Sequence, residues 1–504
     1  MQKSSPTNLM LITGHISFFV LIALSVIFAN ERVIYIDSAA QLFEMIQRDG
    51  FAVYDHRMTM LITQSLPLLF IWMGAGLQSV IIAYSVAAPL LAYLVFLVIA
   101  YILKDVRLGL LLLLPLLCMR CTFYHAISET FSLIIYATLL LALIRYHTPE
   151  KGLIAFIYYL SVALCTLCCV FMHPIGMFFV LFLLGYHFVD CQMKPSKVFI
   201  LIAVTLLVSA TVKLFLTSGH DAGYMPTWQD IIYCFHHPGD LKIISRFFTR
   251  IIDFYIYPIA LYAIVLVWHI RHKQWWRMAF GILFNICFFG MSVIVYRREG
   301  GAVGVERAFL PLMFFAAIPF LCEVLPHIDV RRNHLFLIIF VAALTFAFAK
   351  IIDTSKHYRS RLAKLNEVST VALEMGQHKL VADVTSIDNV FHPTWCNSFE
   401  TMLLSALQGP DRTVTFYVED EPIQLDNPNY QDSTSFIAVS WWRMWLYKTL
   451  RPQYFILPQQ PYQQLLFVDG KPIIRPIPSI IQTTQSYSDA EDVNKPNTQL
   501  SNVQ

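Results

Sequence analysis

Two carboxylates stand out because they lie in polar stretches between long apolar runs. Asp37 follows Tyr35 and Ile36 in the first polar stretch, residues 31–50, and Glu129 closes the second, residues 120–129. A carboxylate at the edge of a membrane can take a proton from a hydroxyl group, which is general-base catalysis. We therefore expect Asp37 and Glu129 to be the catalytic candidates.

Arginine dominates the basic residues of these stretches. A guanidinium group can bind a phosphate through two parallel hydrogen bonds, whereas lysine acts as a point charge. Lys213 lies about one turn from the end of its apolar run, where it would either reach the headgroup layer or contact a lipid phosphate. The expected phosphate-binding residues are Arg120, Arg297, Arg298, Arg307 and Lys213.

Further polar residues are expected to line a substrate site on the same side. The glycine-rich segment 299–306 would let backbone approach a ligand, or it is a mobile turn with solvated charges. His173 precedes Pro174 and either ends a helix or faces the site. The expected lining residues are Tyr35, His173, Glu299 and Glu306.

The elements that position these residues are apolar runs of membrane-spanning length. Of the 504 residues 57% are hydrophobic and 14% charged, about half the usual charged share. These features predict an α-helical membrane protein with about eleven spans. The runs are 9–29, 79–103, 108–124, 128–145, 152–172, 175–190, 197–217, 252–270, 278–296, 308–325 and 335–352.

Residues 58–78 form one further apolar run, which either spans, re-enters or lies at the interface because Gln64, Pro67 and Gly74 interrupt it. If it does not cross, nearly all compact basic clusters fall on the N-terminal side of the membrane. Those clusters contain Lys104, Arg107, Arg145, Lys151, Lys194, Lys197, Arg271, Lys273, Arg277, Arg331 and Arg332. The positive-inside rule then predicts a cytoplasmic N-terminus in the cytoplasmic (inner) membrane and an extracytoplasmic C-terminal domain.

The polar loop at 30–57 is expected to contain a surface helix. Ser38 and Gln41 form a capping-box pattern, which predicts a helix that begins just after Asp37. Leu42, Phe43 and Ile46 share one face of that helix, as in a helix lying on a membrane surface. The alternative to catalysis is that Asp37 only caps this helix.

Three regions are predicted. Residues 1–353 form the membrane domain, residues 354–482 a small α/β domain, and residues 483–504 a polar tail without periodicity. In the second region, 378–384 and 413–418 alternate as strands do, and 361–376 reads as a helix ended by Gly376. The net charge of +3 and the absence of a basic domain argue against nucleic acid as a partner.

This plan resembles the GT-C superfamily of membrane glycosyltransferases, such as protein O-mannosyltransferases and aminoarabinose transferases. The resemblance rests on the order of spans, on Tyr35-Ile36-Asp37 in the first external loop, and on the corner at 120–129. It implies transfer of a sugar from a polyprenyl-phosphate or pyrophosphate carrier, with Asp37 as base and arginines on the phosphate. Many members have a second acid where Ser38 stands, so no motif here indicates a divalent metal.

Two other functions fit parts of the sequence. A transporter or flippase of a lipid-linked or small substrate should carry ionisable residues in the middle of its spans, and few are present. A polysaccharide polymerase or ligase would also have external arginines, together with one large loop between spans. The long terminal domain favours the glycosyltransferase.

The topology can be tested with reporter fusions. A reporter that works only outside the cytoplasm, fused after residue 400, should be active because the basic clusters place the C-terminal domain outside. A reporter that works only in the cytoplasm, fused at the same position, is the matched control. Cytoplasmic activity would reverse the predicted orientation.

Overall fold

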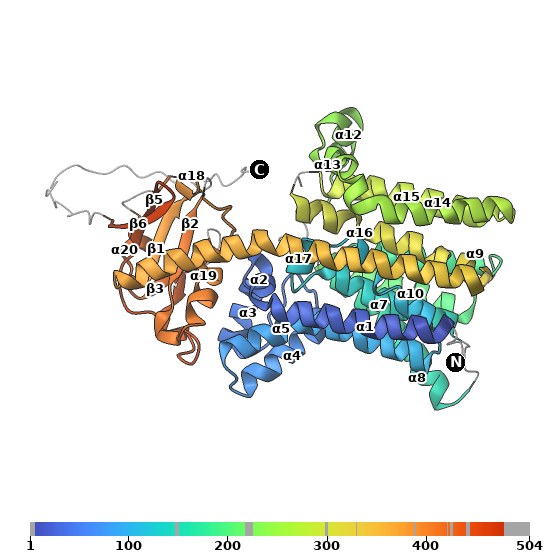
Figure 1. The fold of residues 1–504 in the computed structure, drawn as a ribbon, viewed down its shortest axis with the longest axis horizontal. Helices are drawn as coiled ribbons and strands as arrows, with labels where there is room; N and C mark the ends of the chain where they lie inside the picture. The colour runs from blue at the N-terminus through green and yellow to red at the C-terminus, as the bar shows by residue number, and fades with distance from the viewer. Residues whose placement is uncertain are drawn as a thin grey trace, which may run out of the picture.

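A bundle of long helices makes up most of the molecule, and a small sheet lies at one end of it (Figure 1). The computed structural model describes residues 6–146, 151–216, 225–297, 301–328, 330–387, 390–420, 422–423, 427–439 and 444–477. The helices up to the sheet are α1 (Pro6–Ile27), α2 (Ala29–Val33), α3 (Ile36–Arg48), α4 (Met60–Trp72), α5 (Leu77–Leu97), α6 (Val106–Leu110), α7 (Glu129–Arg145), α8 (Leu153–Met172), α9 (Gly176–Asp190), α10 (Lys197–Leu216), α12 (Trp228–His236), α13 (Lys242–Thr249), α14 (Ile256–Arg271), α15 (Trp275–Val295), α16 (Ala302–Pro319) and α17 (Val330–Glu374).

The bundle has the lengths and composition of a helical membrane protein. Within the described residues, eight helices are long and apolar enough to cross a membrane. Their outward side chains are apolar, such as Leu207 on α10, which is 70% exposed. The helix α16 lies in the middle and is almost wholly buried. The predicted total of about eleven crossings stays a prediction, because α7, α9 and the segment around α6 are shorter.

The predicted continuous span at 108–124 is wrong, because this segment is broken. The helix α6 ends at Leu110, and a 3-10 turn follows at Leu114–Leu117. Pro115 lacks an amide hydrogen and disfavours continuation of a helix. Residues 108–119 are buried within the protein, the only setting in which irregular backbone is tolerated at membrane depth.

The ambiguous run at 58–78 folds as a short helix and a turn. The helix α4 has 13 residues, which corresponds to about 20 Å, against about 30 Å for the hydrocarbon layer. The chain then reverses at Gly74, whose φ of +71° suits glycine, and continues as α5. The length of α4 supports the interpretation in which this run does not cross.

The capping-box prediction for the first loop is wrong. The helix α3 begins at Ile36, so Asp37 lies in its first turn, and no side chain caps it. The side-chain oxygen of Gln41 instead accepts hydrogen bonds from Gln64 (2.9 Å) and from the Tyr84 hydroxyl (3.1 Å). The side chain of Gln41 is therefore bonded to one buried side chain of α4 and one of α5, instead of taking part in a capping box at the start of α3.

The prediction that α3 lies on the membrane surface is also wrong. Its residues Ser38–Ile46 are buried, because the C-terminal domain covers the helix. The ring of Phe43 stacks on Phe399 with centroids 4.5 Å apart and also contacts Phe455 and Trp445. The apolar face of α3 is thus a protein interface.

The C-terminal domain contains a four-stranded sheet in the order β2-β1-β5-β6. Strand β1 is parallel to β2 and β5, and β5 is antiparallel to β6. The predicted strands at 378–384 and 413–418 correspond to β1 and β2. The elements are β1 (Lys379–Asp383), α18 (Val384–Ile387), α19 (Asn397–Ala406), β2 (Thr415–Glu419), α20 (Pro428–Gln431), β3 (Ser435–Ile437), β4 (Met444–Leu446), β5 (Gln463–Val468) and β6 (Lys471–Pro476).

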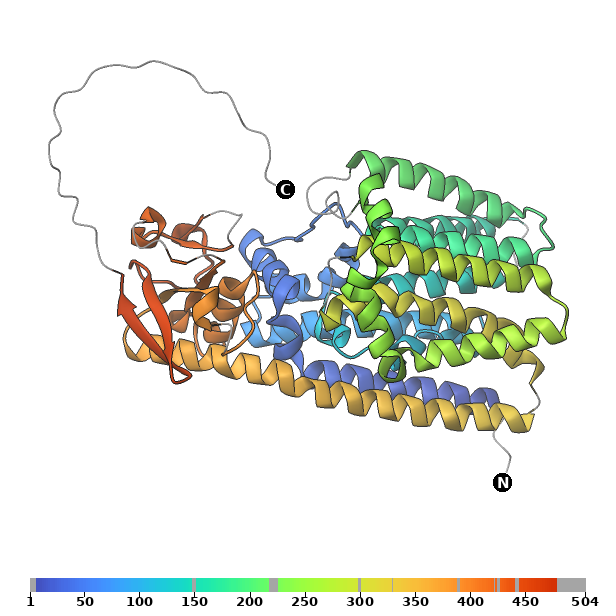
Figure 2. The same ribbon diagram turned by 90° about the horizontal axis from the view of Figure 1, so that it is seen from above.

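The helix α17 joins the two parts of the molecule. It has 45 residues, runs beside α1 and continues into the sheet region (Figure 2). The predicted boundary at 353/354 therefore falls inside one continuous helix. Its predicted glycine end is confirmed, since Gly376 has a φ of +67° just after the helix. The predicted tail, residues 483–504, lies outside the described residues.

The N-terminus lies at the end of the bundle opposite the sheet (Figures 1 and 2). Buried and half-buried ion pairs join α9, α15 and the end of α16 by linking Arg277 to Asp190 (2.6 Å) and to Glu323 (2.8 Å). Arg145 at the end of α7 also pairs with Asp190 (3.6 Å). These pairs link α7, α9, α15 and the segment that follows α16, so they fix how the helices pack at this end of the bundle.

The stacking of Phe43 can be tested by truncation. Phe43→Ala should lower the free energy of unfolding by about 3–5 kcal/mol, because a fully buried aromatic ring leaves a cavity. Thermal unfolding in detergent and protease cleavage of α17 would measure the loss. Phe19→Ala on α1 is the matched control, since Phe19 is 60% exposed. Equal thermal unfolding midpoints for Phe43→Ala and Phe19→Ala would contradict the packing of Phe43 against the C-terminal domain.

Candidate active site

A buried ion cluster lies at the end of the bundle that faces the sheet. Glu129 begins α7, whose cap is the Ser128 hydroxyl. One Glu129 oxygen accepts a hydrogen bond from Arg57 (2.5 Å), and the other accepts one from Arg307 (2.7 Å). These contacts bring together the first loop, the corner at 120–129 and the start of α16. Three stretches that are far apart in the sequence thus meet at one carboxylate.

Asp37 belongs to the same cluster. Its half-buried carboxylate interacts electrostatically with Arg307 and with Tyr84 of α5. The side chain of Arg307 keeps 25% of its surface exposed. A carboxylate in the first turn of α3 and a cation near the start of α16 therefore act on each other electrostatically.

The turn between α8 and α9 and the last turn of α10 each supply one more polar group. The ring of His173 accepts a hydrogen bond from the Ile175 amide (3.2 Å), and burial together with Arg57 holds the pKa of His173 well below its usual value. The ammonium of Lys213 interacts with this ring and donates to the Val170 carbonyl (2.9 Å). Gly176 permits the turn, because a Cβ there would lie 1.9 Å from the Cys169 carbonyl oxygen.

Glu306 and Arg120 make structural contacts beside the cluster. The buried Glu306 carboxylate accepts hydrogen bonds from the backbone amides of Arg120, Cys121 and Thr122, so it fixes the corner onto α16. The Arg120 guanidinium donates to the Asp253 carbonyl (2.7 Å) and lies over the Phe254 ring. Glu306 therefore bonds the corner and Arg120 the segment just before α14, and the expectation that they contact substrate stays a prediction.

The remaining predicted residues lie at different distances from the cluster. The Tyr35 ring makes an edge contact with His125, with centroids 5.1 Å apart, so it borders the cluster. Arg297 at the end of α15 pairs with Asp230 of α12 (2.7 Å), which occupies its guanidinium. Arg298 and Glu299 lie outside the described residues.

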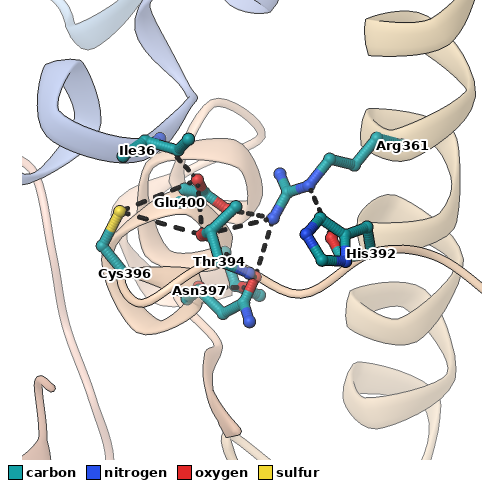
Figure 3. A network of polar contacts seen from close by, with 8 residues as sticks. Ile36, Arg361, His392, Thr394, Cys396, Asn397 and Glu400 are labelled. Carbon is teal, nitrogen blue, oxygen red and sulfur yellow. Dashed lines mark hydrogen bonds and ion pairs between the residues drawn. The ribbon is translucent and has the colours of Figure 1, made fainter. Parts of the chain in front are cut away.

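Sequence reasoning missed four residues of this region. Arg57 and His125 lie in polar stretches that had been singled out, so their position was a usable signal. Burial and nearby Arg307 lower the pKa of His125 to about 3, which keeps its ring neutral. Arg361 and Glu400 come from the C-terminal domain and meet the turn before Asp37 (Figure 3). Glu400 is 364 positions from Ile36 and gave no signal in the sequence.

The donor set of the described residues contains no group of three or more His, Cys, Asp or Glu placed to hold a metal ion. No protein-family model, no curated protein and no solved structure matches the chain. The chemistry of the site must therefore be argued from its own groups. Those groups are a half-buried carboxylate, two arginines that share one buried counter-ion, and neutral histidines.

Such an arrangement suits an anionic ligand next to a base. Arg57 and Arg307 share Glu129, and Arg57 also pairs with Asp55 (3.6 Å), so Arg307, the more exposed of the two arginines, is the cation that could bind a phosphate. Both Glu129 oxygens are already bonded to arginines, which favours its role as a counter-ion. Asp37 is half-buried and keeps an accessible surface, and it acts electrostatically on the Arg307 guanidinium.

The ion cluster can be tested by a double-mutant cycle. Glu129→Gln should lower the free energy of unfolding by about 3–5 kcal/mol, because it leaves buried arginine charge without a counter-ion. Adding Arg57→Met should cost less than the sum of the single variants, since the partners depend on one another. Thermal unfolding in detergent measures each variant. If the losses of unfolding free energy in the two single variants simply added up in the double variant, the pairing of Glu129 with Arg57 would be contradicted.

Proposed function

We propose that this chain is a membrane glycosyltransferase that moves a sugar, or a sugar-like group, from a polyprenyl-phosphate-linked donor to an acceptor at the extracytoplasmic face. The observation that carries the proposal is the ion cluster of Glu129, Arg57 and Arg307 at one end of an apolar bundle, with the Asp37 carboxylate close enough to act electrostatically on Arg307. The same end faces the sheet, which the distribution of basic residues predicts to be extracytoplasmic.

The proposed reaction uses Asp37 as the general base. The Asp37 carboxylate takes the proton of the acceptor hydroxyl, and that oxygen attacks the anomeric carbon of the sugar. The bond between this carbon and the phosphate oxygen breaks, and the electron pair leaves with the phosphate. Arg307, held by Glu129 beside Arg57, stabilises the charge that develops on the leaving group.

An apolar cavity supports a lipid-linked donor. It measures about 620 Å³ and lies among α13, α14, α15 and α16, with Ile259, Phe289 and Leu312 in its walls. Its lining residue Tyr255 donates a hydrogen bond to the Val305 carbonyl (3.0 Å), two positions before Arg307. A chain held in this cavity would therefore end close to the first turn of α16. The polyprenyl tail is the occupant that its apolar walls suit best.

The assignment of the base can be tested with Asp37→Asn. Asparagine keeps the size of the side chain but cannot accept the proton, so transfer should fall by about 10²-fold or more. Transfer from a panel of polyprenyl-phosphate sugars to be screened with the purified full-length chain would measure the rate. Binding of polyprenyl phosphate alone should stay close to normal.

The test of Asp37→Asn has two controls. Thermal unfolding of Asp37→Asn should stay close to that of the unchanged protein, since asparagine keeps the size of the side chain and Asp37 is not the N-cap residue of α3. Asp353→Asn removes an exposed carboxylate of α17 that pairs with Lys356, outside the cluster, and should leave transfer unchanged. Transfer by Asp37→Asn at the normal rate would rule out Asp37 as the base.

A further inference from the structure

A carboxylate of the C-terminal domain reaches the residue that precedes Asp37. Glu400 on α19 is completely buried, and one of its oxygens accepts a hydrogen bond from the Ile36 amide (2.6 Å). The same oxygen accepts a hydrogen bond from the Thr394 hydroxyl (2.9 Å). The other oxygen pairs with the Arg361 guanidinium of α17, which also bonds Asn397 (2.7 Å). Figure 3 shows Ile36, Thr394 and Arg361 around the Glu400 carboxylate.

Ile36 has a backbone conformation that its side chain disfavours. Its φ is +42°, in the left-handed region, where a β-branched residue is an outlier. Such a conformation persists only where the surroundings hold it. The hydrogen bond from the Ile36 amide to Glu400 is a contact that holds it, and the next residue in the chain is Asp37.

The docking of the C-terminal domain rests on other contacts. Phe43 stacks on Phe399, Arg451 pairs with Asp49 (2.9 Å), and the Tyr454 hydroxyl donates to the Ala75 carbonyl (2.9 Å). A buried ion pair is a poor source of docking energy, because both charges lose their hydration. A specific task at the turn accounts better for a wholly buried Glu400.

We propose that Glu400 is a positioning residue for the active site. It holds Ile36 in the left-handed conformation and so fixes the direction in which the Asp37 carboxylate points. The C-terminal domain is then a part of the active site, since it supplies both Glu400 and the Arg361 that orients it. This inference rests on the proposed function in one respect, namely that Asp37 is the base.

The test combines two substitutions in the full-length chain. Glu400→Gln should lower kcat for transfer by roughly 10- to 100-fold with little change in KM for the donor, because a base displaced by about 1 Å loses this much. Ile36→Gly removes the disfavoured side chain, and glycine adopts positive φ readily. In the Glu400→Gln background, Ile36→Gly should therefore recover about tenfold in kcat.

A merely structural role would give a different pattern. If Glu400 only docked the domain, Ile36→Gly would recover nothing and would add its own loss. Asp49→Asn removes another ion pair of the same interface and should leave kcat unchanged. Unchanged kcat in Glu400→Gln, or no recovery in the double variant, would overturn the proposal.

Amide hydrogen exchange separates this inference from the proposed function, because it needs no substrate. The Ile36 amide should exchange at least about tenfold faster in Glu400→Gln than in the unchanged protein, since it loses its charged acceptor. Unchanged exchange would overturn the positioning role. Faster exchange, together with normal transfer by Asp37→Asn, would instead overturn Asp37 as the base.

Discussion

The packing at the end of the bundle that faces the sheet depends on one buried carboxylate, Glu129, which two arginines share. Glu129 cannot lie between helices unless its charge is balanced, and Arg57 and Arg307 balance it from two different segments. This requirement draws the first loop, the start of α7 and the start of α16 to one point. Asp37 is part of that arrangement through Arg307, so the constraint on charge in an apolar bundle also assembles the proposed site.

The C-terminal domain completes this end of the molecule. It buries the apolar face of α3 through Phe43 and Phe399, and it fixes the turn before Asp37 through Glu400. The helix α17 runs without a break from the bundle into the domain, which limits how the two can move relative to each other. The proposed base, Asp37, therefore lies at the boundary between the helical bundle and the C-terminal domain, and both parts contact the turn in which it lies.

A donor with an apolar chain and an anionic head matches the separation between the apolar cavity and the cationic groups of the protein. The cavity among α13, α14, α15 and α16 is apolar, and the cationic groups lie at the start of α16. Burial strengthens the interaction between these cations and a phosphate, because little water remains to screen it. The proposed transfer would take place where the apolar walls end and the C-terminal domain begins.

The sequence by itself determined the long apolar helices, the strands β1 and β2, the glycine end of α17 and the polar stretches that hold Asp37 and Glu129. These features depend on local composition and periodicity, which a single chain displays directly. Only the tertiary structure decided that Pro115 and its neighbours form a broken segment, that Asp37 lies inside the first turn of α3, and that Glu306 bonds backbone amides. It also selected Arg307 from the candidate arginines and joined Glu400 to Ile36 across 364 positions. These features depend on which groups pair with each buried charge, and the pairs form only when distant segments of the chain pack together.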